Sequence, residues 1–477
     1  MVKRIHFNAF DMNCVGHQSP GLWAHPRDRS WQYKDVEYWT ELAATLERGL
    51  FDGIFIADVI GYYDVYKGSA YHAIQQGAQI PVNDPLQLAV PIAMATQHLG
   101  IGITASTSFE HPYTFARRLS TADHLTKGRI GWNIVTSYLE SGARNVGQDG
   151  LRRHDNRYQI ADEYLEVLYK LFEGSWEEGA VVRDRKKRIF AHPEKVHEIG
   201  HKGTFFEVPG YHLCEPSPQR TPVLYQAGAS EAGRSFAARH AECVFVAAPT
   251  KGILKNYIAD LRWRATAAGR DAQKLLTFNL ATLIVDETDA KAQAKFEEYQ
   301  RYTSYDGALV FMSGWTGIDF GQYAPTEPVK KVETNAVISI VDHLTGGDRS
   351  WSVQQLASWG GIGGLGPVFV GSAATVADIL EDWVKETDVD GFNLAYAVTP
   401  ETFEDVVTYL VPELQRRGIY PTCYPPGKTL REKLFGDGPY VPSSHPAARY
   451  RDIEKVKREQ RHEPAAFADA REAKPVW

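Results

Sequence analysis

Cysteine is scarce in this sequence, and its placement excludes the sites that cysteine usually builds. The 477 residues contain four cysteines, which are far apart and form no CxxC pair: Cys14, Cys214, Cys243 and Cys423. So few thiols cannot form a disulfide framework, and a reducing, cytoplasmic setting is therefore expected. The histidines form neither an HxH nor an HExxH pattern, so we expect no metal site.

Long apolar runs and a strong net charge are also missing. No stretch of about 18 apolar residues occurs, which argues against a membrane span, and the N-terminus MVKRIHFNAFDMNC lacks the apolar core of a secretory signal. The formal net charge of −7 gives no electrostatic reason to expect nucleic acid or an anionic membrane surface as a partner. Neither a GxSxG motif nor a P-loop is present, which disfavours acyl and phosphoryl transfer on those templates.

What the sequence does contain is a regular alternation of short apolar runs and longer amphipathic stretches. Eight runs are predicted to be strands, at residues 4–9, 51–58, 99–107, 129–137, 222–228, 243–249, 275–285 and 391–398. The helices predicted to follow them lie at residues 35–48, 85–99, 112–126, 155–173, 230–240, 251–268, 288–303 and 401–416. This alternation favours an α/β fold in which eight parallel strands close into a (β/α)₈ or TIM barrel. A doubly wound open sheet with a second domain remains the alternative, because closure cannot be read from the number of strands.

Three longer segments interrupt the alternation, at residues 174–221, 304–372 and 418–477. We therefore predict a single barrel over residues 1–417 with insertions at the first two segments, followed by a C-terminal extension. Hairpin strands are expected in the first insertion, within AVVRD and GTFFEVPGYHL. The second insertion is a candidate lid, because long segments of a barrel usually lie at its C-terminal face; an oligomerisation element is the alternative. Its glycine-rich part, GGIGGLG (360–366), does not lie between a strand and a capped helix and is predicted to be a flexible loop.

In a barrel, the residues at the C-terminal ends of the strands face the active site. The ends of the first five predicted strands carry polar, aromatic and small residues: Asn13 to His17, Asp58, Thr104 to Ser108, Thr136 to Tyr138, and Gly228 to Ser230. Large aromatic residues, which line apolar pockets as well as cores, are plentiful in the chain. The strand ends therefore predict a site that works without a metal or a hydrolytic triad.

The strongest local signal is QAGASEAGR (226–234), where a strand ends and a helix begins at Ser230. Free backbone N–H groups at the start of a helix bind phosphate well, and Ser230 adds a hydroxyl. An ordinary serine N-cap is the alternative. His154 and Tyr158 lie four residues apart on one helix face and could donate to the same phosphate, although a surface histidine and a core tyrosine would show the same spacing.

Long blocks of the sequence resemble one known family. They are NAFDMNCVGHQSPGLWAHP (8–26), FDGIFIADV (51–59), QIPVNDP (79–85), LSTADHLTKGRIGWNIVTSYL (119–139), HDNRYQIADEYLEVLYKL (154–171) and HLCEPSPQRTPVLYQAGASEAGRSFAARHAE (212–242). These blocks are similar to the nitrilotriacetate/pristinamycin/dibenzothiophene-sulfone monooxygenases, a family of bacterial-luciferase-like flavin enzymes. The resemblance extends to REKLFGDGPY (431–440) and is greatest to the branches that oxidise long-chain alkanes and dimethyl sulfide.

The resemblance implies a TIM barrel of the bacterial-luciferase-like type and a homodimer or homotetramer. It also implies a two-component system, in which a separate NADH:FMN reductase supplies reduced FMN (FMNH2) and O2 is the co-substrate. A flavin C4a-(hydro)peroxide would then transfer one oxygen atom to a small organic substrate. Because the flavin carries the chemistry, the protein's part is to orient it and to keep water out.

The same resemblance assigns site residues. FMN contacts are implied at Asp58, Thr104, His154, Tyr158, Ala229 and Ser230, and we place Ser137 with them. His17, Cys14 and Tyr138 are implied to lie beside the reacting position of the flavin, where one of them could donate a hydrogen bond to the transferred oxygen. His17 is favoured because an imidazole both donates and accepts, whereas Cys14 is equally explained as a small buried residue. The substrate pocket is expected to include Phe10, Tyr63, Gln79, Phe311 and Trp315.

The substrate is the least determined part of the prediction. Cys14, His17, Tyr63 and Gln79 match the pocket pattern of the alkane branch, but Tyr138 and Phe311 stand where that branch would favour histidine. The stretch SWGGIGGLGPVFVGS (358–372) is more similar to the sulfur-compound branch. We therefore expect an organosulfur substrate similar to dimethyl sulfide or dibenzothiophene sulfone. A long-chain alkane is the first alternative, and a deazaflavin- or FMN-dependent dehydrogenase of the same barrel type is the second. A flavin-binding protein without oxygenation is a non-enzymatic alternative.

Overall fold

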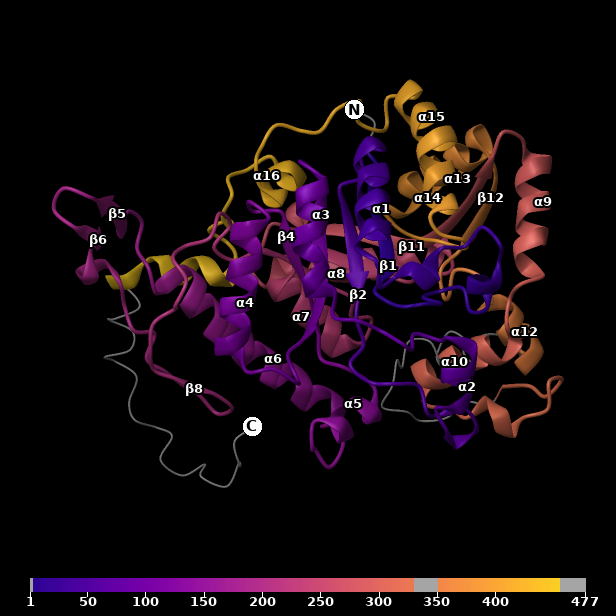
Figure 1. The fold of residues 1–477 in the computed structure, drawn as a ribbon, viewed down its shortest axis with the longest axis horizontal. Helices are drawn as coiled ribbons and strands as arrows, with labels where there is room; N and C mark the ends of the chain where they lie inside the picture. Colours follow the sequence, from indigo (N-terminus) through magenta and orange to yellow (C-terminus); the bar gives the residue numbers. More distant parts are fainter. Residues whose placement is uncertain (1–2, 330–350, 455–477) are drawn as a thin grey trace.

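The computed structural model describes residues 3–329 and 351–454, and its centre is a closed barrel of parallel strands (Figure 1). In chain order the barrel strands are β1 (His6–Met12), β2 (Gly53–Ala57), β3 (Gly100–Ser106), β4 (Ile130–Val135), β9 (Val223–Gln226), β10 (Cys243–Val246), β11 (Leu276–Asp286) and β13 (Gly391–Ala395). The barrel closes because β10 pairs with β11, β11 with β13, and β13 with β1. This closure confirms the predicted TIM barrel and excludes the open sheet.

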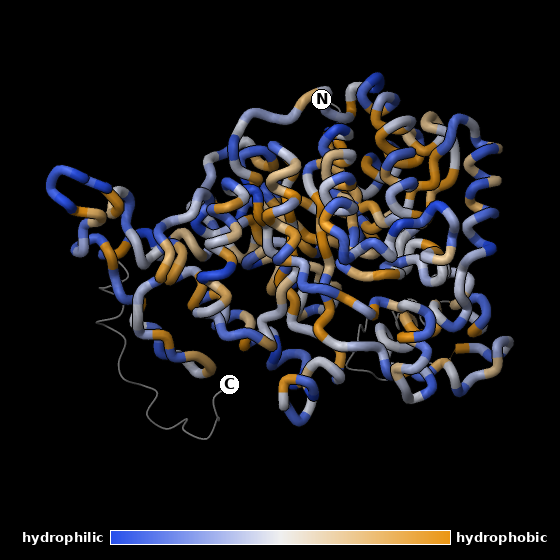
Figure 2. Tube along the Cα trace, in the orientation of Figure 1, coloured by the Kyte–Doolittle hydropathy of each residue, from blue (hydrophilic) through white to orange (hydrophobic). Residues whose placement is uncertain are grey.

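Helices surround the barrel. The main ones are α1 (Val36–Arg48), α3 (Ala89–Ala95), α4 (Pro112–Leu125), α6 (His154–Tyr169), α7 (Glu231–His240), α8 (Lys251–Ala267), α9 (Asp289–Gln300), α13 (Ala373–Thr387), α14 (Glu401–Asp405) and α15 (Val411–Arg416). They form where apolar residues recur at helical spacing; in α1, for example, Trp39, Leu42 and Leu46 are all buried against the barrel. Figure 2 shows the resulting concentration of hydrophobic residues at the centre of the molecule.

Aromatic side chains fill the N-terminal half of the barrel interior. Phe55, Tyr225, Phe245 and Phe278 pack together there, with ring centroids 4.3–6.4 Å apart. Gly131 makes room for this cluster, because a Cβ atom at that position would lie 2.5 Å from the Tyr225 ring. Side chains therefore fill the N-terminal half of the barrel interior, and space for a ligand lies at the C-terminal ends of the strands.

Two elements of the seventh β/α unit were not predicted. Strand β12 (Val368–Ser372) pairs with the outer part of β11, from Thr282↔Val368 onward, and helix α13 follows it directly. β11 has eleven residues, so its last part extends past the barrel and leaves an edge that β12 covers. The predicted insertion at 304–372 thus ends in a ninth strand of the sheet, which a count of barrel strands does not reveal.

The described part of the second insertion lies at the C-terminal end of the barrel. It contains α10 (Tyr305–Thr316) and α12 (Val353–Trp359), which pack together and, through α10, against α2 (Tyr71–Gln76). Residues 330–350 of the candidate lid lie outside the described residues. The first insertion forms two small hairpins, β5 (Val181–Asp184) with β6 (Ile189–Ala191) and β7 (His201–Lys202) with β8 (Glu207–Val208). The predicted hairpin strands are thus present, and Figure 1 shows that β5 and β6 project from the body of the molecule.

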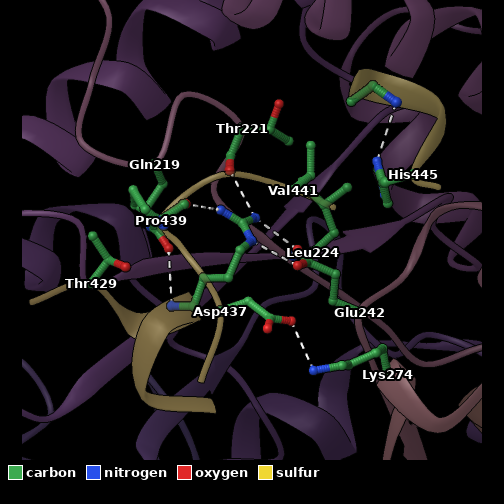
Figure 3. A network of polar contacts seen from close by, with 12 residues as sticks. Gln219, Thr221, Leu224, Glu242, Lys274, Thr429, Asp437, Pro439, Val441 and His445 are labelled. Carbon is green, nitrogen blue, oxygen red and sulfur yellow. Dashed lines mark hydrogen bonds and ion pairs between the residues drawn. The ribbon is translucent and has the colours of Figure 1, made fainter. Parts of the chain in front are cut away.

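The C-terminal extension covers the other end of the barrel. Its helix α16 (Leu430–Phe435) inserts Leu430 among the aromatic residues of the barrel interior, and Figure 1 places α16 at the end opposite α10. Arg431 is fully buried and donates from Nε and Nη2 to the carboxylate of Glu242 at 2.7 and 2.8 Å. Its remaining N–H groups bond to the carbonyl oxygens of Pro439 and Thr221, shown with Glu242 in Figure 3. Within residues 3–329 and 351–454, none of the helices is long and apolar enough to span a membrane.

Candidate active site

A cavity of about 340 Å³ lies at the C-terminal ends of the barrel strands. Twelve of the predicted site residues line it: Phe10, His17, Asp58, Gln79, Thr104, Ser137, Tyr138, His154, Tyr158, Ala229, Ser230 and Trp315. They come from the ends of five strands, from the start of α6 and α7, and from α10. The structure therefore brings together residues that lie up to 305 positions apart in the sequence (Phe10 to Trp315).

Three predicted residues lie one layer behind the cavity wall. Cys14 is buried and bridges its backbone to Val82, and burial raises the pKa of its thiol well above the ordinary value, so it is a neutral group. Tyr63 is hydrogen-bonded to Tyr138 at 2.7 Å between their hydroxyl oxygens. Phe311 stacks on Trp315 with ring centroids 5.3 Å apart. These side chains support the wall and do not form it.

One end of the cavity has the geometry of an anion site. Ser230 is the N-cap of α7, where its Oγ accepts from the backbone N–H of Gly233 at 3.1 Å and lies 3.1 Å from Nε2 of His154. The rings of His154 and Tyr158 lie 5.1 Å apart, so the predicted grouping on one helix face is confirmed. A Cβ atom at Gly233 would come within 2.8 Å of the Tyr158 hydroxyl, which explains why a glycine follows the cap.

Arg157 belongs to this end of the cavity and was missed from the sequence. Its side chain is 4% exposed and lines the cavity; Nη1 donates to the carbonyl of Arg152 at 2.7 Å, while Nε is buried without a hydrogen-bond partner. Within the described part of the chain, no carboxylate lies within ion-pair distance of it, and burial lowers its pKa. The sequence HDNRY places Arg157 three residues after His154, and that spacing was the available signal.

The middle of the cavity presents polar groups from three strands. Asn133, also missed from the sequence, donates from Nδ2 to Oγ1 of Thr104 at 3.0 Å, and its Oδ1 is buried without a partner. Burial raises the pKa of Asp58 to about 7, and the negative charge of Asp84 adds to the shift. Ser137 has a left-handed backbone (φ 60°), a strained conformation that is common at functional sites.

Another part of the cavity wall is aromatic, with Phe10, Tyr138 and Trp315, and His17 belongs to it. The imidazole of His17 meets the Phe10 ring edge-on at 4.4 Å, and burial lowers the pKa of His17 to about 3. It is therefore neutral at pH 7 and holds one N–H and one lone pair. Its ring bonds to the backbone of Phe10, and its Nε2 lies 3.4 Å from Nε2 of Gln18, so both neighbours hold the imidazole at the cavity wall.

These features fit a flavin mononucleotide. A buried guanidinium without a carboxylate partner and the start of a ten-residue helix suit a phosphate group. Asn133 and Thr104 line the cavity as a bonded amide and hydroxyl, and such polar groups suit the edge of a ring system. In the described residues, no group of three or more His, Cys, Asp or Glu side chains is placed to hold a metal ion.

A second chamber of about 490 Å³ adjoins the first. The two chambers share lining residues, namely Phe10, Phe55, Ala227, Ala229, Ala247, Leu280 and Leu365. The second is lined mainly by apolar side chains, with Arg234 and Asn393 among the few polar ones. A ligand in the first chamber could therefore extend into the second.

Comparisons with known proteins found close relatives of this chain. The sequence model of a family described as luciferase-like monooxygenase matches residues 9–390. The chain is 50% identical to dimethyl-sulfide monooxygenase of Hyphomicrobium sulfonivorans, over 99% of both chains, and the crystal structure of that protein matches with a TM-score of 0.89 over 98% of this chain and 100% of that one. It is 49% identical to long-chain alkane monooxygenase of Geobacillus thermodenitrificans (strain NG80-2), over 95% of this chain and 99% of that protein. A riboflavin lyase solved with modified FMN and the substrate riboflavin is 34% identical, with a TM-score of 0.89 over 94% of this chain and 100% of that one.

Proposed function

The chain belongs to the luciferase-like monooxygenase family, whose members of this kind use reduced flavin, and on that premise we propose that it oxidises a small organosulfur compound with FMNH2 and O2. One oxygen atom of O2 enters the substrate, the other leaves as water, and the reduced flavin supplies the two electrons. The observation that carries the proposal is a single cavity lined both by a cationic anion site and by an aromatic wall. Membership of a monooxygenase family argues against the dehydrogenase alternative and against a binding protein without activity.

Four side chains would hold the phosphate of FMN. Ser230 and the free N–H groups of α7 bind phosphate oxygens, and the rings of His154 and Tyr158 carry polar atoms on the same side. Arg157 supplies the positive charge, because it is a buried guanidinium that lines the cavity together with Ser230 and His154. A phosphate held in this way fixes where the rest of the cofactor lies.

The remaining residues orient the flavin ring and exclude water. When bound, reduced flavin activates O2 for transfer of one atom. We assign contacts with the ring system to Thr104, Asn133 and Asp58, from the ends of β3, β4 and β2, and to Ser137 and Ala229 beside them. Phe10, Trp315 and Leu365 form apolar walls that keep water from the reacting atoms.

His17 is the group we place at the reacting oxygen. As a neutral imidazole it holds one proton that can be donated as a hydrogen bond, without bringing a full charge into an apolar pocket. Cys14 lies behind the wall and is assigned no such role.

The pocket beside His17 favours an organosulfur substrate. FMN would share the first chamber, of about 340 Å³, with the substrate and leave little room for it. The walls that remain are aromatic, with Tyr138, Trp315 and Phe10, and sulfur makes favourable contacts with aromatic rings. A small thioether similar to dimethyl sulfide suits both the size and the lining.

One observation favours a second candidate, a chain-like alkane. The adjoining chamber, of about 490 Å³, has mainly apolar walls and would accept the length of an alkyl chain. The sequence identities of 50% and 49% to the sulfide and alkane enzymes do not distinguish the two substrates.

The substrate can be tested by coupled turnover. The purified protein is supplied with NADH, FMN and a generic NADH:FMN reductase, and product is measured for dimethyl sulfide, dibenzothiophene sulfone and hexadecane at equal NADH flux. We expect product from dimethyl sulfide and little from hexadecane. Product from hexadecane alone would replace the sulfide proposal with the alkane one, and product from none of the three would reject both.

We also propose that reduced FMN comes from a separate NADH:FMN reductase and that the protein acts as a homodimer or homotetramer. The glycine-rich segment 360–366 is followed by strand β12, not by a helix, so it is not built as a phosphate loop for NADH. This loop therefore supports a supply of reduced flavin by a separate protein.

The phosphate site makes a separate prediction about cofactor affinity. Arg157→Leu is expected to weaken FMN binding by about 10- to 100-fold, the size of one charge-assisted hydrogen bond, and to leave riboflavin binding nearly unchanged because riboflavin has no phosphate. Dissociation constants for FMN and riboflavin, from flavin fluorescence, measure the effect. Arg153→Leu, at the exposed N-cap of the same helix, is the matched control. Equal losses for FMN and riboflavin in Arg157→Leu would show that Arg157 does not bind the phosphate.

A further inference from the structure

A series of hydrogen bonds runs along the aromatic wall of the cavity. Trp315 donates from its indole N–H to the hydroxyl of Tyr63 at 3.2 Å, and Tyr63 is bonded to Oε1 of Gln79 at 2.8 Å. Gln79 donates from Nε2 to the backbone carbonyl of His17 at 2.7 Å. The hydroxyl oxygens of Tyr63 and Tyr138 lie 2.7 Å apart. Tyr138, Gln79 and Trp315 line the cavity together with His17, and Tyr63 lies behind them.

The directions of these bonds follow from what each group can donate or accept, and Trp315 also lies within hydrogen-bonding reach of Tyr138. If the Gln79 amide were turned round, its oxygen would face the carbonyl oxygen of His17 at 2.7 Å, which is repulsive; Oε1 therefore faces Tyr63 and must accept. Tyr63 has one hydroxyl proton, and that proton goes to Gln79. The indole of Trp315 can only donate, so Tyr63 accepts from it. Tyr63 then has no proton left, and the bond to Tyr138 must be donated by Tyr138.

We infer that Tyr138 presents only oxygen lone pairs to the cavity and thereby selects a thioether over its S-oxide. This inference deepens the proposed organosulfur function and rests on it. A thioether sulfur is a weak acceptor that packs against the aromatic walls, whereas an S-oxide brings a strong acceptor oxygen that would face the Tyr138 oxygen without a proton between them. Tyr138 is thus a specificity-determining residue, and the polarity of its hydroxyl is set by Gln79 through Tyr63.

The packing around these hydrogen-bonded residues keeps their bonds in the directions given above. Tyr63 is 2% exposed, and its ring meets the Phe311 ring edge-on with centroids 5.6 Å apart. Gly314 of α10 lies against the face of Tyr63, where any Cβ atom would overlap the ring. Trp315 is stacked on Phe311, so its N–H stays directed at Tyr63. Reversing the bonds would leave a buried polar group unsatisfied, which is unfavourable.

Tyr63→Phe tests the inference, because it removes the acceptor of the Tyr138 proton and frees that proton for the cavity. The probes are dimethyl sulfide and dimethyl sulfoxide, and the readout is the dissociation constant of each from the change in flavin absorbance of the FMN-loaded protein. We expect the ratio of the sulfoxide constant to the sulfide constant to fall by about three- to tenfold in Tyr63→Phe, the size of one neutral hydrogen bond. Tyr66→Phe loses a comparable buried hydroxyl, bonded to Asp306 at 2.7 Å and outside this series of hydrogen bonds, and should leave the ratio unchanged.

Tyr138→Phe provides a second variant if Tyr63→Phe does not fold. It removes the lone pairs without adding a donor, so the ratio should also fall, but by less. An unchanged ratio in the folded variants, or an equal fall in Tyr66→Phe, would overturn the inference. Turnover of dimethyl sulfide is measured separately: if the ratio shifts while the wild-type protein does not oxidise the sulfide, the polarity of Tyr138 stands and the proposed substrate is wrong.

Discussion

Arg431→Met is expected to lower the free energy of unfolding by about 3–5 kcal/mol, the usual cost of removing one partner of a buried ion pair. The Arg431 and Glu242 side chains are 2% and 3% exposed, so the variant leaves the Glu242 carboxylate in an apolar environment with only the backbone N–H of Leu224 as a partner. Arg431 also satisfies the carbonyl oxygens of Pro439 and Thr221, which lose their donors. Urea unfolding followed by far-UV circular dichroism measures the change.

The charge of Glu242 can be separated from the loss of packing. The double variant Arg431→Met, Glu242→Gln removes both charges and should recover part of the stability lost by Arg431→Met alone. Arg416→Met breaks an exposed pair with Glu413 and should change stability very little. If Arg431→Met were no more harmful than Arg416→Met, the ion pair would not be what holds the C-terminal extension in place.

His17→Ala should reduce product formation by about 100-fold or more while FMN binding is retained, because a hydrogen-bond donor at the reacting oxygen typically contributes that much. We expect the variant to release hydrogen peroxide in place of product. Product and peroxide formed per NADH consumed, with a generic reductase, measure this partition. The reasoning depends on His17 lining the cavity as a neutral imidazole.

His212→Ala is the matched control for this variant. His212 is also a buried neutral histidine, whose pKa is lowered to about 4 by burial, but it bonds to Ser120 and does not line the cavity. The His212→Ala variant should be less stable than the wild-type protein but should give the same ratio of product to peroxide. If His17→Ala kept the wild-type ratio, His17 would have no part in the oxygen transfer.

The barrel and most of the cavity wall were predictable because both depend on local sequence patterns. Buried parallel strands are short apolar runs, and the polar residues that end them must lie at one mouth of the barrel. Ser230 could be found because a strand, small residues and a helix cap occur together in nine positions. His154 and Tyr158 could be grouped because they share a helix face.

Other features depend on which groups meet in three dimensions. Arg157 was missed because its importance lies in having no carboxylate partner, and a sequence does not show what a side chain lacks. The inferred direction of the Tyr138 hydrogen bond depends on Gln79 and Tyr63, and Tyr63 lies 75 positions away from Tyr138. Strand β12 was missed because it pairs outside the barrel, where no strand is required by the fold class. In each of these cases the feature arises from contacts between distant segments, and a local sequence pattern does not show such contacts.

The closing of the barrel has a consequence for synthesis of the chain. β1, among the first residues to leave the ribosome, finds its second neighbour only when β13 emerges, with His6 opposite Gly391. Until then one edge of β1 has unpaired backbone groups, and such edges invite association with other chains. The nascent protein therefore passes most of its translation with one edge of β1 unpaired. The barrel can close only after β13 has been synthesised.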